Sequence, residues 1–120
     1  MATKKESVLK TKSYKFAVRI VRLSQYLQQK KKEFVLFKQI LRSGTAIGAI
    51  IREAEFAQSP ADYINKFSIA LKEANEADYW LDLLNDTEYI ESKLYESMSN
   101  DCKELISMLV STIKTLKTKS

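Results

Sequence analysis

The chain has 120 residues, of which 45% are hydrophobic and 29% are charged, and its formal net charge is +5. This length and hydrophobic fraction favour one folded domain over residues 1–120 and argue against a disordered chain. The sequence has no histidine, which is the commonest general base and metal ligand, so we expect no enzymatic activity, no metal and no cofactor.

The charge is divided unevenly along the chain. Residues 1–52 hold 13 Lys and Arg against 2 Asp and Glu, whereas residues 53–106 hold 4 against 13. This division suggests basic helices that lie against acidic ones, in the same subunit or in a neighbouring one. The alternative is that both sets of side chains simply face water.

The expected location is the cytoplasm. The longest apolar run, Ala46 to Ile51, is far shorter than the roughly 20 residues that span a bilayer. The first residues lack the apolar segment of a secretory signal. The single cysteine, Cys102, cannot form an internal disulfide and fits a reducing compartment.

Two helical patterns occupy the first half of the chain. The first predicts a helix from near residues 11–13 to the lysines at 30–32, with one apolar face made of Phe16, Ile20, Leu23 and Leu27. The second predicts a helix that extends to about Ala57, with an apolar face made of Phe37, Ile40, Leu41, Gly44, Ile47, Gly48 and Ile51.

The third helix has a clear start signal in Ser59, Pro60 and Asp62, which supply a cap, a first-turn proline and a first-turn negative charge. It should end near Thr87 and bury Ile64, Phe67, Leu71, Ala74 and Leu81. A fourth helix carries a near-heptad row: Leu94, Met98, Cys102, Leu105, Leu109, Ile113 and Leu116. Short connections make consecutive helices antiparallel, so the predicted fold is all-α, an up-down-up-down four-helix bundle with frayed ends at residues 1–10 and 118–120.

Two features of the second helix predict contacts with neighbouring helices. Gly44 and Gly48 lie on its apolar face, where a glycine costs about 1 kcal/mol relative to alanine, so we expect a close helix approach. We favour an approach inside the bundle over one between subunits. We expect Arg52 to pair with Glu73 or Glu76 of the third helix in a structural salt-bridge network, with a ligand site as the alternative.

Cations form two rows beside the apolar faces of the first two helices. Such rows suit a phosphate backbone, with an aromatic ring available to stack on a base; the alternative is an ordinary solvated surface. The candidate nucleic-acid-binding residues are Lys15, Arg19, Arg22, Tyr26, Lys38, Arg42 and Arg52.

Several large apolar residues lie away from the predicted core faces. A monomer rarely exposes much contiguous apolar surface, so we interpret them as a subunit interface, with scattered surface residues as the alternative. The candidate interface residues are Ile50, Phe56, Ile69, Tyr79 and Trp80.

Five short segments form a recognisable set: RSGTAIGA at 42–49, IREA at 51–54, AQS at 57–59, FSIALKEA at 67–74 and YWL at 79–81. As a set, they resemble the bacterial four-helix-bundle family found in intervening sequences of large-subunit ribosomal RNA genes. The similarity runs from about residue 13 to residue 117. This family is similar in turn to the accessory variability protein of diversity-generating retroelements. Ile50 and Phe56 depart from the Asn and Gly that are usual in the family.

The resemblance implies an antiparallel bundle that assembles as a ring, most often a homopentamer, through head-to-tail contacts that close by rotation. By analogy with the retroelement relatives, it also implies RNA and a reverse transcriptase as partners, and it offers no catalytic residue. The leading hypothesis is a non-enzymatic accessory protein that binds RNA. The alternative is a protein–protein scaffold with no nucleic-acid role.

Overall fold

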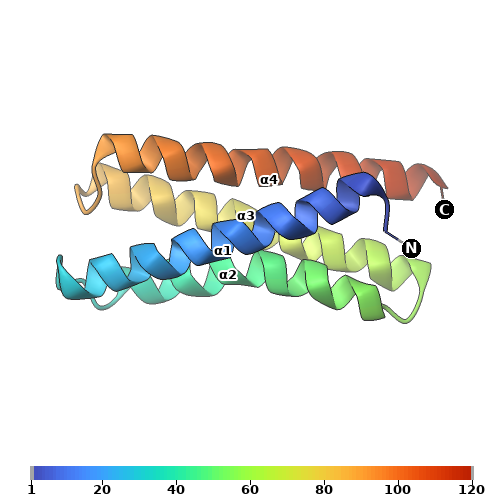
Figure 1. The fold of residues 1–120 in the computed structure, drawn as a ribbon, viewed down its shortest axis with the longest axis horizontal. Helices are drawn as coiled ribbons and strands as arrows, with labels where there is room; N and C mark the ends of the chain where they lie inside the picture. Colours follow the sequence, from blue (N-terminus) through green and yellow to red (C-terminus); the bar gives the residue numbers. More distant parts are fainter. Residues whose placement is uncertain (1, 120) are drawn as a thin grey trace.

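The computed structural model describes residues 2–119, most of which lie in four helices (Figure 1). The helices are α1 (Lys4–Gln29), α2 (Leu36–Glu53), α3 (Pro60–Asp86) and α4 (Ser92–Lys119), and a short 3-10 turn, η1 (Ala54–Phe56), follows α2. No strand occurs in this part of the chain. The predicted all-α fold is therefore confirmed.

The helices run alternately up and down along a rod of 47 × 22 × 18 Å (Figure 1). α1 and α3 each pack on both α2 and α4, which makes the predicted antiparallel up-down-up-down bundle. The α1–α2 and α3–α4 turns lie together at one end, which we call the turn end. The α2–α3 turn and both ends of the chain lie at the other, which we call the terminal end.

The core lies along the axis of the rod and draws on all four helices. α3 contributes three small residues, Ala70, Ala74 and Ala77, between the buried side chains of Phe67 and Leu81. The residues that the sequence predicts on the apolar face of each helix are buried in the structure, with six exceptions. The exceptions are half-buried: Leu41, Gly48, Ile64, Leu71, Leu94 and Leu116.

α1 begins earlier than the sequence predicted. The Thr3 hydroxyl accepts a hydrogen bond from the Glu6 N–H at 3.2 Å and donates one to the Glu6 carboxylate at 2.9 Å. Glu6 is buried and also accepts a hydrogen bond from the Tyr63 hydroxyl of α3. Residues 4–10 are thus helical rather than frayed, and the missed signal is the capping pair of Thr3 and Glu6. Residues 118–119 are also helical, whereas residue 120 lies outside the described residues.

Glu33 organises the turn between α1 and α2. Its buried carboxylate accepts hydrogen bonds from the backbone N–H groups of Val35, Leu36 and Phe37, at 2.8–2.9 Å. The first turn of a helix leaves such donors without partners, so the carboxylate completes the start of α2. Burial alone would raise the pKa of Glu33, but the three N–H groups outweigh it and the pKa is lowered.

The α2–α3 turn follows the predicted start signal. The Ser59 hydroxyl accepts a hydrogen bond from the Asp62 N–H at 3.0 Å, and Pro60 occupies the first turn of α3. α3 ends at Asp86, with Thr87 as its cap, close to the predicted end. No helix within residues 2–119 is both long enough and apolar enough to cross a membrane.

Gly44 and Gly48 allow α1 and α2 to pack closely. A Cβ atom added to Gly44 would lie only 2.6 Å from Cγ1 and 2.8 Å from Cγ2 of Ile20. A Cβ atom added to Gly48 would lie 3.3 Å from the backbone of Ser13. Both partners belong to α1 of the same chain, so the predicted contact inside the bundle is confirmed.

Candidate functional site

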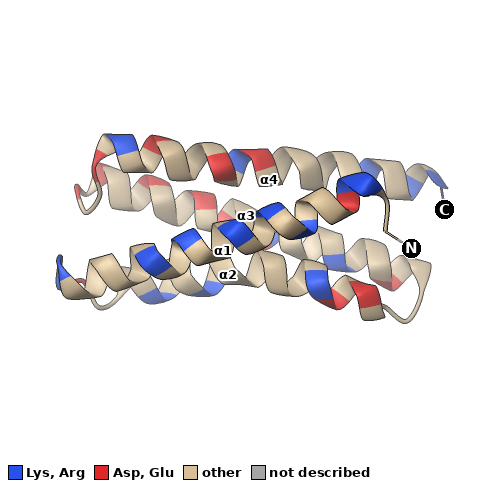
Figure 2. Ribbon diagram, viewed as in Figure 1, with Lys and Arg blue, Asp and Glu red and all other residues tan. Residues whose placement is uncertain are grey.

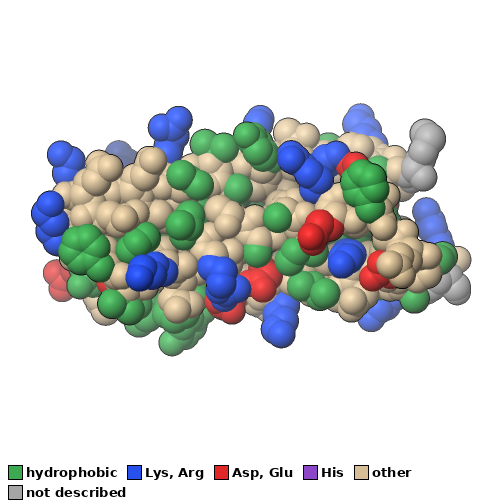
Figure 3. Space-filling model, turned by 90° about the horizontal axis from the view of Figure 1, so that it is seen from below, with side chains coloured by type: hydrophobic (Ala, Val, Ile, Leu, Met, Phe, Trp, Pro, Cys, Tyr) green, Lys and Arg blue, Asp and Glu red, His purple; other side chains and the backbone are tan. Residues whose placement is uncertain are grey.

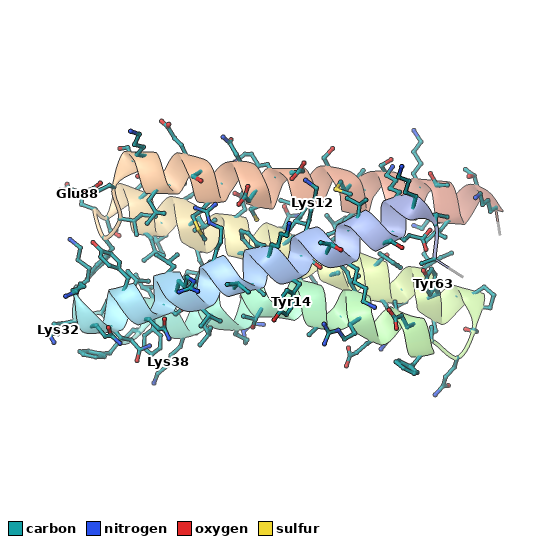
Figure 4. The ribbon with its side chains drawn as sticks, viewed as in Figure 1. Lys12, Tyr14, Lys32, Lys38, Tyr63 and Glu88 are labelled. Atoms are coloured by element: carbon teal, nitrogen blue, oxygen red, sulfur yellow. The ribbon has the colours of Figure 1, made fainter. Side chains whose placement is uncertain are left out.

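Basic side chains of α1 reach acidic side chains of α4. Arg19 Nη1 lies 2.6 Å from Asp101 Oδ2, and Lys12 Nζ lies 3.0 Å from Glu104 Oε1. Figure 4 shows Lys12 on the side of α1 that faces α4. Basic and acidic helices therefore lie against each other within one subunit, and the charge of Arg19 is compensated there.

Arg42 bridges α2 and α3. Its Nη1 lies 3.2 Å from Glu73 Oε1 and its Nη2 pairs with Glu76, which also accepts the indole N–H of Trp80 at 3.1 Å. The predicted pairing of Arg52 with these two glutamates is wrong. α2 and α3 form a hairpin about residues 57–59, so Arg52 faces the start of α3. Arg42, ten residues and about 15 Å further back, is the residue that faces Glu73.

Two tyrosines of α1 lie beside cations. The Arg52 guanidinium carbon lies 5.9 Å from the ring centroid of Tyr14. Lys31 Nζ lies 6.0 Å from the ring centroid of Tyr26, which is half-buried. Both distances are within the range of a cation–π contact. Tyr26, predicted to stack on a base, therefore already has a cation of its own chain near its ring.

Three of the predicted cations have no charged, polar or aromatic partner within residues 2–119, and a fourth, Arg52, has only the ring of Tyr14. Lys15, Arg22 and Lys38 are exposed and take part in no ion pair or hydrogen bond within residues 2–119. Figure 2 shows blue segments along α1 and the first half of α2, and red segments mainly on α3 and α4. The structure thus separates the predicted cations into engaged ones, Arg19, Arg42 and Arg52, and free ones on the outer surface of α1 and α2.

The five predicted interface residues fall into two groups. Phe56, Tyr79 and Ile69 are 82%, 58% and 36% exposed. Ile50 and Trp80 are half-buried and pack against the core. The Tyr79 and Trp80 rings meet edge to face, with centroids 5.1 Å apart. Of the five predicted interface residues, Phe56 and Tyr79 therefore offer the most exposed side chains to another molecule.

Sequence reasoning missed other exposed apolar residues. Phe34 and Val35, in the α1–α2 turn, are 56% and 70% exposed, and Val18 and Val21 are exposed on α1. The available signal for the turn was two apolar residues placed just after a lysine run, where helical periodicity stops. Figure 3 shows hydrophobic side chains spread among Lys and Arg over the α2 side of the molecule.

A groove of about 480 Å³ lies between α1 and α2. Its lining combines small residues, Ala17, Gly48 and Ala49, with the rings of Tyr14 and Phe56. The absence of large side chains at the three small positions leaves room for a side chain of another molecule beside Phe56.

The one cysteine is part of the core. Cys102 is fully buried and its Sγ donates a hydrogen bond to the Ala74 carbonyl at 3.3 Å. Burial, followed by the nearby Asp78, raises the pKa of the Cys102 thiol to about 12, so the thiol is protonated at neutral pH. Within residues 2–119, no three His, Cys, Asp or Glu side chains are grouped to hold a metal ion.

The family model of the 23S rRNA-intervening sequence protein matches residues 5–111. The chain belongs to this family. Among solved structures, it is similar to a protein of unknown function from Bacteroides thetaiotaomicron, described as a member of the S23 ribosomal protein family. The two are 62% identical over 92% of this chain and 98% of the other, with a TM-score of 0.90. None of the curated proteins compared with the chain matches it.

The resemblance proposed from the sequence is confirmed by this match. The part that matches the 23S rRNA-intervening sequence protein family contains every candidate residue, from Lys15 to Trp80. It also contains both glycines of the α1–α2 contact and the α1–α2 turn that Glu33 organises. The candidate surfaces therefore lie in the part of the chain that the family model covers.

Proposed function

We propose that this member of the 23S rRNA-intervening sequence protein family is a non-enzymatic accessory protein that binds RNA and acts as a ring-shaped homo-oligomer. The observation that supports RNA binding is that four of the predicted cations are exposed and have no acidic partner within residues 2–119: Lys15, Arg22, Lys38 and Arg52. The family name, which links it to intervening sequences of ribosomal RNA, agrees with this choice of partner. A cytoplasmic location and a homopentamer complete the proposal.

Phosphate contacts would supply most of the affinity. Each cation that neutralises a phosphate releases a counterion, so binding driven in this way weakens steeply as the salt concentration rises. The net charge of +5 per chain is multiplied in a homo-oligomer, which increases the attraction for a polyanion. Contacts to phosphates read no bases, so such binding is tolerant of sequence.

The first test is sedimentation velocity with a labelled structured RNA at about 50 and about 300 mM salt. Comigration at low salt that disappears at high salt supports phosphate-driven binding, and the same run gives the mass of the oligomer. The informative variant is Lys15→Glu with Arg22→Glu, which should abolish comigration and leave the oligomer mass unchanged. Arg19 is left intact because its replacement would also break the pair with Asp101.

The matched control is Lys93→Glu with Lys114→Glu. Both lysines are exposed on α4, without an ion pair within residues 2–119, and the change in net charge is the same. Comigration should survive in this control, because its charges lie away from the basic surface of α1 and α2. An equal loss of comigration in both variants would mean that only the total charge matters for RNA binding. If the variant Lys15→Glu with Arg22→Glu still comigrates with RNA, Lys15 and Arg22 do not contribute to the RNA-binding surface.

The second candidate function is a scaffold that binds another protein. The observation that favours it is the groove beside Phe56, together with the exposed ring of Tyr79. No comigration of the wild-type protein with RNA at either salt would favour the scaffold. The cations would then serve subunit packing or solubility.

A further inference from the structure

The α1–α2 turn combines exposed apolar and cationic side chains. We call residues 30–38 the lysine turn; its lysines, Lys30, Lys31, Lys32 and Lys38, are all exposed. Phe34 and Val35 lie between them and are 56% and 70% exposed. Figure 4 shows Lys32 and Lys38 together at the turn end of the molecule.

The lysine turn holds one acidic residue, Glu33, and four lysines, so it keeps a net charge of +3 and has no carboxylate at its surface. Glu33 is buried, and its carboxylate is directed toward the backbone N–H groups of Val35, Leu36 and Phe37. The exposed charged side chains of the lysine turn are therefore all positive, and they flank the exposed Phe34 and Val35 along the chain.

None of the acidic residues of α4 forms an ion pair with a lysine of the lysine turn within residues 2–119. The last ion pair between α1 and α4 on the way to the turn end is that of Arg19 with Asp101. Beyond it, α1 lies beside α2 and diverges from α4, as Figures 1 and 2 show. Arg22 and Lys15, which have no acidic partner within residues 2–119, extend the row of cations from the lysine turn along α1.

We propose that the lysine turn binds single-stranded RNA, with Phe34 stacked on an unpaired base and the lysines in contact with the flanking phosphates. This rests on the proposed RNA-binding function and assigns its principal site. A phenyl ring stacks on any base that is not already stacked in a helix, and lysines beside it hold the backbone. The strand can continue past Arg22 to Lys15, a path of about 22 Å along α1.

The surroundings of the lysine turn favour a flexible strand over a lipid surface. Glu88, which Figure 4 labels at the same end of the rod, is exposed, as is Glu91 of the same α3–α4 turn. A flat anionic bilayer that reached Phe34 would also approach these carboxylates and be repelled by them. A single strand can follow α1 and avoid the acidic turn.

The test is fluorescence anisotropy with a labelled oligouridine of about 12 nucleotides, within the range of site sizes for single-strand binding. Phe34→Ala should weaken binding roughly tenfold, because one base can no longer stack on a ring. Phe34→Tyr keeps the ring and should bind like the wild type. Val110→Ala, which shortens an exposed apolar side chain of α4 outside both candidate surfaces, is the control and should leave the affinity unchanged.

Two further measurements separate stacking from charge. A 2-aminopurine placed in the strand should be quenched by the wild type and by Phe34→Tyr, but not by Phe34→Ala. Lys30→Gln with Lys31→Gln should reduce the slope of log K against log salt by roughly 0.7 for each phosphate that the variant no longer neutralises. Phe34→Ala should leave this slope unchanged.

The outcomes distinguish this site from the function on which it rests. If Phe34→Ala binds as tightly as the wild type while Lys15→Glu with Arg22→Glu fails, RNA binding stands and the lysine turn is not its site. If the wild type binds no RNA, both proposals fail. A fall in oligomer mass for Phe34→Ala without RNA, or Phe34-dependent binding to phosphatidylserine vesicles with unchanged RNA affinity, would also overturn the site.

Discussion

One carboxylate closes the first hairpin of this bundle. Glu33 holds three N–H groups at the start of α2, in a turn where Lys32 adopts a φ of 53°, in the left-handed region. Its lowered pKa means that the folded state prefers the ionised carboxyl more strongly than the unfolded chain does. The contribution of Glu33 to stability is therefore complete above its unfolded pKa and is lost as the pH falls through the folded pKa.

Glu33→Gln should lower the free energy of unfolding at pH 7 by about 1 kcal/mol, the usual contribution of a helix cap. The difference from the wild type should shrink as the pH falls below about 4.3, where the unfolded carboxyl takes up its proton. Urea titrations at a series of pH values measure both effects. Glu96→Gln, an exposed glutamate of α4, is the control and should show neither. A constant difference at every pH would mean that the charge of Glu33 is unimportant.

At the scale of elements, α1 and α2 can pack closely because Gly44 and Gly48 have no side chain. Gly44 accepts the Ile20 side chain against its backbone, and the methyl group of an alanine would lie 2.6–2.9 Å from three carbons of Ile20. Two of these carbons, Cγ1 and Cγ2, are attached to the Cβ of a β-branched side chain, which has few alternative rotamers. Relief must then come from a shift of the helices themselves.

Gly44→Ala should destabilise the fold by about 1–2 kcal/mol, because overpacking outweighs the gain in helix propensity. Ile20→Ala alone should cost about 3 kcal/mol through the cavity that it leaves. The double variant should lose less stability than the two single variants lose together, because the new methyl group occupies part of that cavity. Denaturant titrations of the four proteins give the coupling energy. Additive effects would show that Ile20 and Gly44 do not share this space.

The elements also show what the sequence can and cannot reveal. The apolar faces of all four helices follow from the periodicity of single helices, and the start of α3 follows from Ser59 and Pro60. The ion-pair partners of the cations do not follow from that periodicity, because they depend on how two helices align across a hairpin. For this reason Arg42, and not Arg52, pairs with Glu73 and Glu76. That Lys15 and Arg22 have no acidic partner within residues 2–119 likewise depends on the position of α4, which is distant from them in the sequence.

At the scale of the whole molecule, the proposed ring requires a surface that one subunit does not bury. Within residues 2–119, Phe56 is the most exposed large apolar residue, at 82%, and it lines the groove between α1 and α2. Ile50 and Trp80 are already packed in their own bundle, so their substitution would damage the fold as well as an interface. Phe56 is therefore the cleaner probe of self-association.

Phe56→Ser should change the free energy of unfolding by no more than about 0.5 kcal/mol, as expected for an exposed site. It should nevertheless reduce the mass of the oligomer, because the side chain would no longer fill an apolar contact between subunits. Sedimentation equilibrium measures the mass, and Val110→Ser, at a half-exposed position on α4, is the control. An oligomer of wild-type mass would place the interface elsewhere.

An even number of helices returns the chain to the end of the rod at which it began. Both termini consequently emerge together at the terminal end, and the lysine turn lies at the far end of the 47 Å axis (Figure 1). A dye, a surface tether or a fused domain can thus be joined to either terminus without obstructing the lysine turn. Immobilisation through either terminus would present the lysine turn outward to RNA in solution.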